Sequence, residues 1–509
     1  MITGSMTMMS RVLGLARDQV LAHYLGAGGA ADAFFLAFKI PNFFRRLFSE
    51  GAFSQAFVPV LSEYREQGSQ VALKNLVDRV AGCLGSALIF ITVLAVAGAP
   101  VLGFIFAPGF LHDPEKFELL VALIRIMFPY LLLISLTGFA GAILNSYDRF
   151  AIPAFTPVLL NICMILAALV VAPWFSAPWF ALAWSVLLAG VMSFLFQLPF
   201  LQQLHLLPAP KVDWRDPGVR RILRLMLPAL FGVGVSQINL TLDSIIASWL
   251  PDGSISWLFY SDRLVELPLG IFAVAIATVI MPNLSRQHVA KSSEQFSQTL
   301  DWAIRLIVLI ALPATVALVI LAEPIILTLF QHGHLTLHDA LMSSYSLQSY
   351  VLGLLAFMLI KVLAPGYFAR HDMRTPVKIG MIAIASNIVI KAIIVLPLHR
   401  YWQIGHVGLA LSTALSAYIN ALLLYRGLRK KGVYIPGPNW LKIWLRYGFA
   451  NLLMVLTLCG GLHYLTAWHE WGIWLRILNL SILCSGGMFA YILGLALMGF
   501  RPKDFRVAH

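Results

Sequence analysis

Charged residues are scarce in this sequence. Only 12% of the 509 residues are Asp, Glu, Lys or Arg, whereas 60% are hydrophobic. Because soluble domains carry about a quarter charged residues, a water-soluble globular protein and a disordered chain are both excluded. The composition indicates an integral membrane protein whose apolar side chains face lipid or pack between helices.

Cysteine is also rare, and its placement argues against a disulfide framework and a zinc site. The four cysteines lie in apolar runs and none has a CxxC spacing: Cys83, Cys163, Cys459 and Cys484. One loop holds three histidines, a group that more often belongs to a solvated loop than to a metal site: His332, His334 and His338. We therefore predict no metal site and no cofactor.

Sequence motifs of soluble enzymes are missing. The sequence has no Walker motif and no nucleophile elbow, and no soluble segment has paired carboxylates. Enzymes that act on polyprenyl phosphates need clustered acids for metal or base chemistry, and none face a predicted membrane surface. We predict that this protein is not an enzyme.

What the sequence does have is a series of long apolar runs, each close to the roughly 20 residues that a membrane-spanning helix needs. They predict an all-α polytopic membrane protein with 14 transmembrane helices at about 5–26, 30–62, 80–107, 119–145, 151–173, 178–203, 222–250, 254–284, 302–331, 342–370, 376–397, 404–427, 444–467 and 473–499. No basic region precedes the first run and no small-residue cleavage site follows it, so we expect it to be retained.

The loops between these runs carry an asymmetric charge. Lys and Arg gather in the loops on one side, and the opposite side has only Lys116 and Arg400. The positive-inside rule then places both termini in the cytoplasm. The net charge of +13 is mostly an orientation signal, so we predict no nucleic-acid partner.

The stretch 32–64 mixes apolar bulk with polar groups. Four polar residues share one helix face at i, i+3, i+7 and i+11: Lys39, Asn42, Arg46 and Glu50. Pro41 interrupts the hydrogen-bond ladder in mid-segment, which is tolerated where neighbouring helices or water satisfy the freed groups. A cation in the middle of a lipid-facing helix costs about 2.5–3.5 kcal/mol on insertion scales. Together with Asp32, this face predicts a water-filled cavity.

Basic residues occur at several points inside the predicted spans. They are Arg11, Arg17, Lys39, Arg45, Arg46, Arg125, Arg263, Lys361, Lys391 and Arg476. Two local pairs are expected to cancel their charges: Arg17 with Asp18, and Arg263 with Glu266 at i, i+3. The first two spans still carry more positive than negative charge. A wet cavity with this balance is suited to an anion.

The chain also repeats itself at a spacing of about 225 residues. The matches include Asp18 with Asp243, Asp148 with Asp372, and Pro153 with Pro376. Each repeat holds six predicted helices, so both begin on the cytoplasmic side and are related by an axis along the membrane normal. We predict two pseudo-symmetric six-helix lobes at 1–215 and 216–431, followed by a C-terminal helix pair at 432–509.

Several segments carry a specific resemblance that covers nearly the whole length. They are SRVLGLARD (10–18), ADAFFLAFKIPNFFRRLFSEGAFSQAFVPVLSEY (31–64), AGAILNSYDRFAIPAF (140–155), YSDRLVELPLGIF (260–272) and KVLAPGYFARHDMRTPVK (361–378). With these segments the chain resembles the MurJ/MviN family of lipid II flippases, within the superfamily of multidrug, oligosaccharidyl-lipid and polysaccharide exporters.

The resemblance implies a fold and an activity. The implied fold has two six-helix lobes around a cavity, and a final helix pair that lines a groove for the lipid tail. The implied activity moves undecaprenyl-pyrophosphate-linked disaccharide-pentapeptide, lipid II, from the inner to the outer leaflet of the bacterial cytoplasmic membrane by alternating access, for peptidoglycan synthesis. We expect the protein to work as a monomer among membrane lipids.

The resemblance also implies a substrate site. The family's cavity arginines correspond to Arg11, Arg17, Arg45 and Arg263, and its required acid to Asp32. Glu50 and Glu266 correspond to further polar cavity positions, and the helix face described above adds Lys39 and Asn42. Guanidinium groups bind a pyrophosphate with two parallel hydrogen bonds, so this set fits the expected substrate.

One position departs from the family pattern. Some members have a sodium site built from an acid on helix seven and an Asn followed four residues later by Asp on helix eleven. Here Asp243 and Asn387 match, but the last position is Lys391. Our hypothesis is that the Lys391 ammonium takes the place of the cation by pairing with Asp243, which makes sodium coupling doubtful.

Other functions fit less well. A drug or cation exporter of the related branch predicts an acidic cavity, whereas the charge here is basic. A scaffold or receptor for cell-wall enzymes has no use for so many cations inside the membrane. A flippase for another undecaprenyl-linked glycan is the serious alternative, because recognition of the pyrophosphate does not distinguish the sugars.

Overall fold

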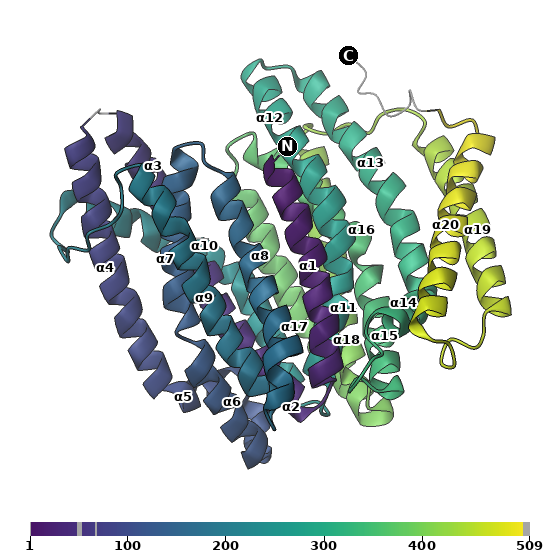
Figure 1. Cartoon of the computed structure of the whole chain (residues 1–509). Coiled ribbons are helices and arrows are strands. Elements are labelled where there is room, and N and C mark those ends of the chain that lie inside the picture. Colours follow the sequence, from purple (N-terminus) through teal and green to yellow (C-terminus); the bar gives the residue numbers. More distant parts are fainter. Residues whose placement is uncertain (1, 48–52, 67–68, 502–509) are drawn as a thin grey trace. The chain divides into compact units, whose positions relative to one another are not determined.

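The computed structural model describes residues 2–47, 53–66 and 69–501. Within these ranges every regular element is helical and no strand is present. The chain forms two compact units, residues 1–256 and residues 257–509. The helices of both units appear in Figure 1.

The first unit holds ten α-helices and the first turn of an eleventh. Their bounds are α1 (Ile2–Leu25), α2 (Gly29–Phe44), α3 (Ser54–Glu66), α4 (Gln70–Ala97), α5 (Ala99–Phe106), α6 (Pro114–Met127), α7 (Tyr130–Ser146), α8 (Ala151–Leu166), α9 (Pro178–Gln203), α10 (Pro217–Ala247) and α11 (Ser254–Pro268).

The second unit takes the rest of α11 and all the helices that follow. After the π-helical turn η5 (Leu269–Ala273) come α12 (Val274–Val289), α13 (Ser293–Ile320), α14 (Ala322–Leu329), α15 (Leu337–Leu352), α16 (Leu354–Phe368), α17 (Arg374–Trp402), α18 (Gly405–Lys430), α19 (Trp440–Tyr464) and α20 (Ile473–Leu497).

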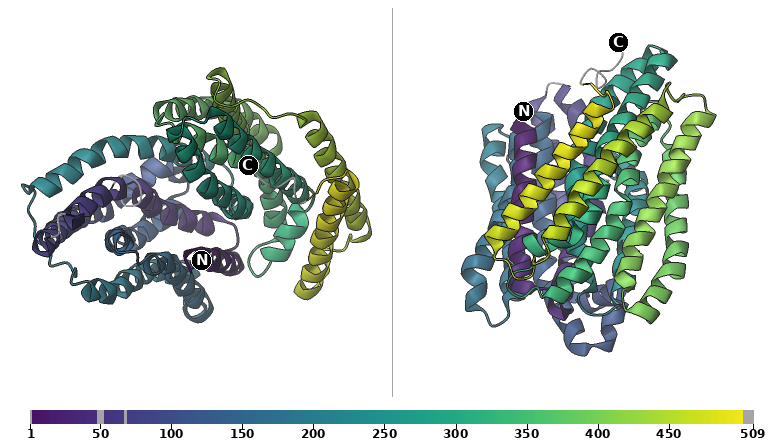
Figure 2. Two further views of the ribbon diagram at one scale, coloured as in Figure 1. Left: turned by 90° about the horizontal axis from the view of Figure 1, so that it is seen from above. Right: turned by 90° about the vertical axis from the view of Figure 1, so that its right-hand side faces the viewer.

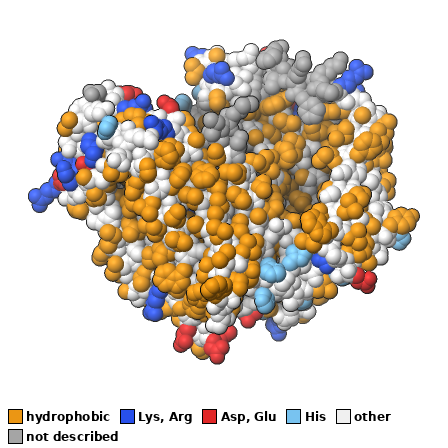
Figure 3. Space-filling model, in the orientation of Figure 1, with side chains coloured by type: hydrophobic (Ala, Val, Ile, Leu, Met, Phe, Trp, Pro, Cys, Tyr) orange, Lys and Arg blue, Asp and Glu red, His pale blue; other side chains and the backbone are white. Residues whose placement is uncertain are grey.

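The described residues contain 11 helical stretches that are long and apolar enough to cross a membrane. Several of them join consecutive helices, as α6 and α7 do within Pro114–Ser146. Helix α1 is long enough but carries Arg11, Arg17 and Asp18. Hydrophobic side chains cover the flanks of the helices on the face in Figure 3, and charged ones gather toward the helix ends. The fold is therefore that of a multi-pass membrane protein, and the count of 14 helices stays a prediction.

An aromatic core holds α3 against α4, α7 and α10 in the first unit. The rings of Phe53 and Phe57 stack with centroids 5.2 Å apart, and Phe57 packs on Phe139 of α7 at 5.1 Å. Val77 of α4 and Ile222 of α10 are buried in the same cluster. Helix α10 thus packs into the first unit, although the predicted lobe boundary at residue 215 precedes it. The lobe boundaries stay a prediction.

The predicted interruption at Pro41 is displaced along the chain. Helix α2 continues through Pro41 to Phe44, and the π-helical turn follows at residues 45–47. The N–H of Arg45 donates to both the Pro41 and the Asn42 carbonyl groups. A π-helical turn shifts hydrogen bonds from i→i+4 to i→i+5, so it rotates the residues beyond it onto another face.

The same turn occurs in both halves of the repeat, and it shows which residues of the two halves correspond. The turn after α7 places Asp148 at φ 61°, and the turn after α16 places His371 at φ 58°, in the left-handed region. Their separation, 371 − 148 = 223, equals that of Pro153 and Pro376. The turns therefore pair Asp148 with His371, so the predicted match with Asp372 is wrong by one residue.

The last two helices, α19 and α20, pack side by side along their lengths (Figure 2). A Cβ added at Gly494 would lie 2.7 Å from the Cα of Ala450, so only glycine permits this approach. The Tyr491 hydroxyl donates to the Leu309 carbonyl of α13 at 2.8 Å, and Arg476 donates to the Leu327 carbonyl at 2.9 Å. These bonds attach the pair to the rest of the second unit.

Candidate functional site

Asp32 lies in the first turn of α2 and is only 1% exposed. Its Oδ1 accepts hydrogen bonds from the Ser256 N–H at 2.9 Å and the Ser256 hydroxyl at 2.6 Å. Its Oδ2 accepts one from the Gly253 N–H at 2.8 Å. The first N–H groups of a helix have no partner within the helix, and a carboxylate satisfies them well. Asp32 therefore caps the start of α11 from a distant part of the chain.

Lys116 adds a positive charge beside this cap. Its Nζ lies 3.5 Å from Oδ2 of Asp32 and 2.5 Å from Oδ1 of Asp252, and it sits 3.9 Å from the centre of the Phe110 ring. The sequence placed Lys116 in an outward loop, but it belongs to the first turn of α6 and is 7% exposed. A buried cation needs such partners because its desolvation is costly.

Arg17 of α1 is buried against α8. Its Nε and Nη2 donate to Oδ1 of Asp18 at 2.9 and 2.6 Å, and its Nη1 donates to Oδ1 of Asn161 at 3.0 Å. The Asn161 amide in turn donates to the Ser10 carbonyl at 3.0 Å. The predicted local pair with Asp18 is confirmed, and the guanidinium is held in one orientation by two helices.

The polar face of α2 is organised around Asn42. The Arg45 Nε donates to Oδ1 of Asn42 at 3.1 Å, and the Asn42 amide donates to the Phe38 carbonyl at 2.7 Å. Lys39 is half-buried nearby along the helix, whereas Arg46 is exposed. Arg45, three residues after Asn42, therefore makes the printed contact with it, and Arg46 does not. Arg11 of α1 is half-buried, and Glu50 lies outside the described residues.

Arg263 and Glu266 of α11 lie in the second unit. Nη1 of Arg263 donates to Oε2 of Glu266 at 2.9 Å, so this predicted i, i+3 pair is confirmed. The guanidinium carbon also lies 4.9 Å from the centre of the Phe259 ring. Both charged side chains are half-buried. A partly exposed ion pair of this kind contributes little to stability.

The three residues at which we expect a lysine to replace a sodium ion differ in burial. Asn387 and Lys391 lie four residues apart on α17 and are both almost fully buried. Residues at this spacing lie on one face of a helix. Asp243 of α10 is half-buried.

Three further residues contact the predicted site residues and were missed from the sequence. Lys116 and Asp252 complete the surroundings of Asp32, and Asn161 orients Arg17. Nothing in local spacing pairs residues so far apart in the chain. Arg125 of α6 was counted among the intramembrane cations but not placed in the site; its side chain is exposed.

The fold and these side chains define a class of protein. A chain whose described residues form only helices, many of them long and apolar enough to cross a membrane and some of them with buried cations, is a polytopic membrane protein of the transporter class. In such proteins the intramembrane charges mark the substrate pathway.

Comparison with known proteins gives the family. The family model for the lipid II flippase MurJ matches residues 21–480. A Vibrio cholerae serotype O1 protein named "Probable lipid II flippase MurJ" is 48% identical, over 100% of this chain and 97% of its own. "Lipid II flippase MurJ" of Burkholderia cenocepacia is 42% identical, over 91% of this chain and 89% of its own. This chain belongs to the MurJ family of lipid II flippases, which confirms the resemblance.

Solved structures agree with this assignment. A structure described as "Lipid II flippase MurJ, inward closed conformation" matches with a TM-score of 0.80 and 27% identity, over 97% of this chain and 98% of its own. A multidrug transporter of the MATE family in an inward-facing conformation matches with a TM-score of 0.65 and 15% identity, over 85% and 98%. The second likeness concerns the fold alone.

Proposed function

We propose that this protein is a lipid II flippase of the bacterial inner membrane, a transporter rather than an enzyme. The observation that carries this proposal is the family match over residues 21–480, together with relatives of the same name along the whole chain. Its substrate is lipid II, and its surroundings are membrane lipids. The protein serves peptidoglycan synthesis by carrying the headgroup from the inner to the outer leaflet.

The proposed substrate site is built from cations on several helices. Its members are Arg11, Arg17, Arg45, Arg263, Asp32, Glu50, Glu266, Lys39 and Asn42. The confirmed pairs of Arg17 with Asp18 and of Arg263 with Glu266 support a mechanism of partner exchange. A carboxylate holds each guanidinium while the site is empty, and the pyrophosphate of the substrate replaces it with a bidentate contact. This exchange avoids exposing an uncompensated charge at membrane depth.

The cap formed by Asp32 supports the alternating-access part of the proposal. Its three hydrogen bonds to Ser256 and Gly253 link two segments that are more than 200 residues apart in the chain. Hydrogen bonds to helix N–H groups are exchangeable with water, so the contact can open and re-form. We infer that this cap is closed in one access state and open in the other.

We also propose the division into lobes and the membrane orientation that the sequence predicts. The lobes are residues 1–215 and 216–431, and residues 432–509 form a helix pair for the lipid tail. Both termini lie in the cytoplasm, as the distribution of Lys and Arg favours. The protein acts as a monomer and binds no nucleic acid.

Lys391 distinguishes this chain from family members that have a sodium site. Its almost complete burial on α17 requires a negative partner, and the family pattern nominates Asp243 for that role. A resident ammonium then makes a bound sodium ion unnecessary. Transport by this protein is therefore proposed to be independent of sodium.

The proposal is tested by reconstituting the full chain into vesicles that carry fluorescent lipid II in both leaflets. A membrane-impermeant reagent then measures how much lipid II reaches the outer leaflet. The intact protein is expected to make the inner pool accessible, whereas Arg17→Ala is not. Arg149→Ala serves as a matched control, because the half-buried Arg149 side chain lies outside the proposed site and donates to Oε1 of Gln203 at 2.7 Å. Equal rates for an undecaprenyl-pyrophosphate-linked glycan without peptide would assign the protein to another glycan.

A further inference from the structure

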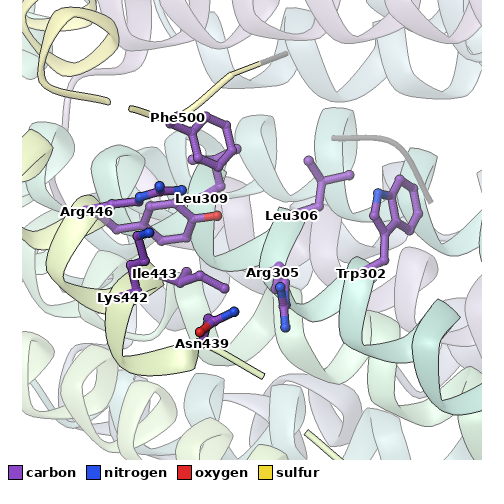
Figure 4. A pocket seen from close by; sticks show the side chains of 10 residues that line it. Trp302, Arg305, Leu306, Leu309, Asn439, Lys442, Ile443, Arg446 and Phe500 are labelled. Carbon is purple, nitrogen blue, oxygen red and sulfur yellow. The ribbon is translucent and has the colours of Figure 1, made fainter. Parts of the chain in front are cut away.

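A cavity of about 270 Å³ lies between α13 and α19 in the second unit, and the residues that line it include none of the proposed transport site. Three basic side chains line it, Arg305 from α13 and Lys442 and Arg446 from α19. Figure 4 shows Lys442 and Arg446 on one side of the cavity, Arg305 on the other, and Phe500 close to Arg446. The remaining wall includes the aromatic rings of Trp302 and Tyr447.

Asp301 is the carboxylate next to this cavity, and it is already engaged by other donors. Its Oδ2 pairs with the Arg305 Nε at 2.6 Å. Its Oδ1 accepts hydrogen bonds from the Tyr434 hydroxyl at 2.7 Å, the Trp440 indole at 2.9 Å and the Gly437 N–H at 3.1 Å. Asp301 therefore neutralises Arg305 and fixes the loop before α19, and it is occupied in that role.

Two cations lie close together on the α19 side of the cavity. Lys442 and Arg446 are four residues apart, and the first turn of α19 contains no acidic residue. Like charges at i, i+4 on a helix repel each other, and cations near a helix N-terminus also oppose the helix dipole. An anion between these side chains and Arg305 removes both penalties.

The surroundings indicate which kind of anion fits. Beside the two cations, Leu441 is 76% exposed and Leu445 is 60% exposed, as expected of side chains that face lipid. Trp302, Trp440 and Trp444 lie around the same end of α19, and tryptophan is enriched at the membrane–water interface. The cavity thus joins a cationic wall to an apolar, lipid-facing flank at headgroup depth.

We propose that this cavity binds the phosphate of an anionic phospholipid headgroup, with Lys442 and Arg446 as the main donors and the acyl chains along Leu441 and Leu445. The bound lipid ties α19 to α13. The proposal does not rest on the transport activity, because lipid binding is measured directly. Phosphate contacts from Arg and Lys are charge-assisted hydrogen bonds, which are stronger than neutral ones.

The test uses the purified full chain in detergent, titrated with phosphatidylglycerol and followed by native mass spectrometry. Lys442→Gln with Arg446→Gln is expected to weaken the tightest lipid-binding event by about tenfold or more, since each tenfold step is only about 1.4 kcal/mol. The matched control is Arg426→Gln with Lys430→Gln, an exposed pair at the same spacing on α18. The control is expected to bind like the intact chain.

Three results would overturn the proposal. The first is equal binding by the cavity variant, the control and the intact chain. The second is displacement of phosphatidylglycerol by inorganic phosphate at similar concentration, which assigns the cavity to a free anion. The third is displacement by lipid II that depends on the same two side chains, which assigns it to the substrate. If the double variant unfolds, the single variant Lys442→Gln is compared with the intact chain instead, because Lys442 is exposed and its replacement should not disturb the fold.

Discussion

The carboxylate of Asp32 accepts two hydrogen bonds from Ser256, one from the backbone N–H at 2.9 Å and one from the hydroxyl at 2.6 Å. These residues come from α2 and from the first turn of α11. The acid that the family resemblance marks as required thus has a structural role of its own, as the cap of another helix. Lys116 lies 3.5 Å away and keeps a positive charge beside the carboxylate.

Asp32→Ala is expected to destabilise the protein more than Ser256→Ala. The first change leaves the Gly253 and Ser256 N–H groups without their acceptor and removes one partner of buried Lys116. Leaving a buried donor unsatisfied costs about 1–3 kcal/mol, whereas Ser256→Ala removes only one hydroxyl. Thermal unfolding in detergent measures the difference. Equal losses for the two variants would contradict the capping role.

Arg17→Lys is expected to impair lipid II transport although it keeps the charge. A guanidinium donates to Asp18 and to Asn161 at the same time, and an ammonium lacks that planar fork. We expect a loss of transport in the vesicle assay close to that of Arg17→Ala. Asn161→Ala, which leaves the Asp18 pair intact, should have a milder effect. Full activity of Arg17→Lys would show that charge alone is sufficient.

The pKa of Asp372 gives a prediction outside the membrane-spanning segments. Its carboxylate accepts hydrogen bonds from Lys431 at 2.7 Å and from the Thr375 hydroxyl at 2.8 Å. The Lys431 bond, followed by those from Thr375, lowers the pKa from 3.8 to about 2. A lowered carboxylate pKa stabilises the fold above the unfolded value, and this contribution is lost as the pH falls through the folded value.

The carboxyl carbon shift of Asp372 measures this pKa by NMR, with Asp372→Asn identifying the signal. We expect a midpoint near 2 in the intact chain and a shift toward 3.8 in Lys431→Gln. The stabilisation is therefore complete at neutral pH and disappears between about pH 4 and pH 2. A titration midpoint near the usual Asp value in the intact chain would show that Lys431 does not lower the pKa of Asp372.

Sodium is expected to have no specific effect on this protein. If the Lys391 ammonium takes the place of the cation, then exchanging sodium for potassium leaves both transport and thermal stability unchanged. Lys391→Ala is expected to lower stability because it removes a buried charge from its partners. A specific sodium response that persists in Lys391→Ala would end this hypothesis.

The sequence predicts the local parts of the site and misses the distant ones. Arg263 with Glu266 at i, i+3 follows from helix geometry, and Arg17 with Asp18 from their adjacency in the sequence, so both pairs could be predicted and are present. The cap between Asp32 and Ser256 depends on how helices pack, which local spacing does not encode.

The polar face of α2 shows a second limit. Ideal helix spacing allows either Arg45, at i+3, or Arg46, at i+4, to reach Asn42, and the structure brings Arg45 to Asn42 and leaves Arg46 exposed. Pro41 indicates a defect in the hydrogen-bond ladder of the helix. Where along the chain that defect lies, and how it changes the polar face of α2, depends on the surrounding packing.

The central claim, lipid II flipping through a cationic site, is tested most directly in cells depleted of their own lipid II flippase. The intact chain, Arg17→Ala, Arg263→Ala and the control Arg286→Ala, an exposed side chain bonded to Asn283, are compared at verified equal membrane levels. The account predicts that the intact chain and the control prevent lysis and that the other two variants do not. Lysis with a well-expressed intact chain, or rescue by Arg17→Ala and Arg263→Ala, would contradict it.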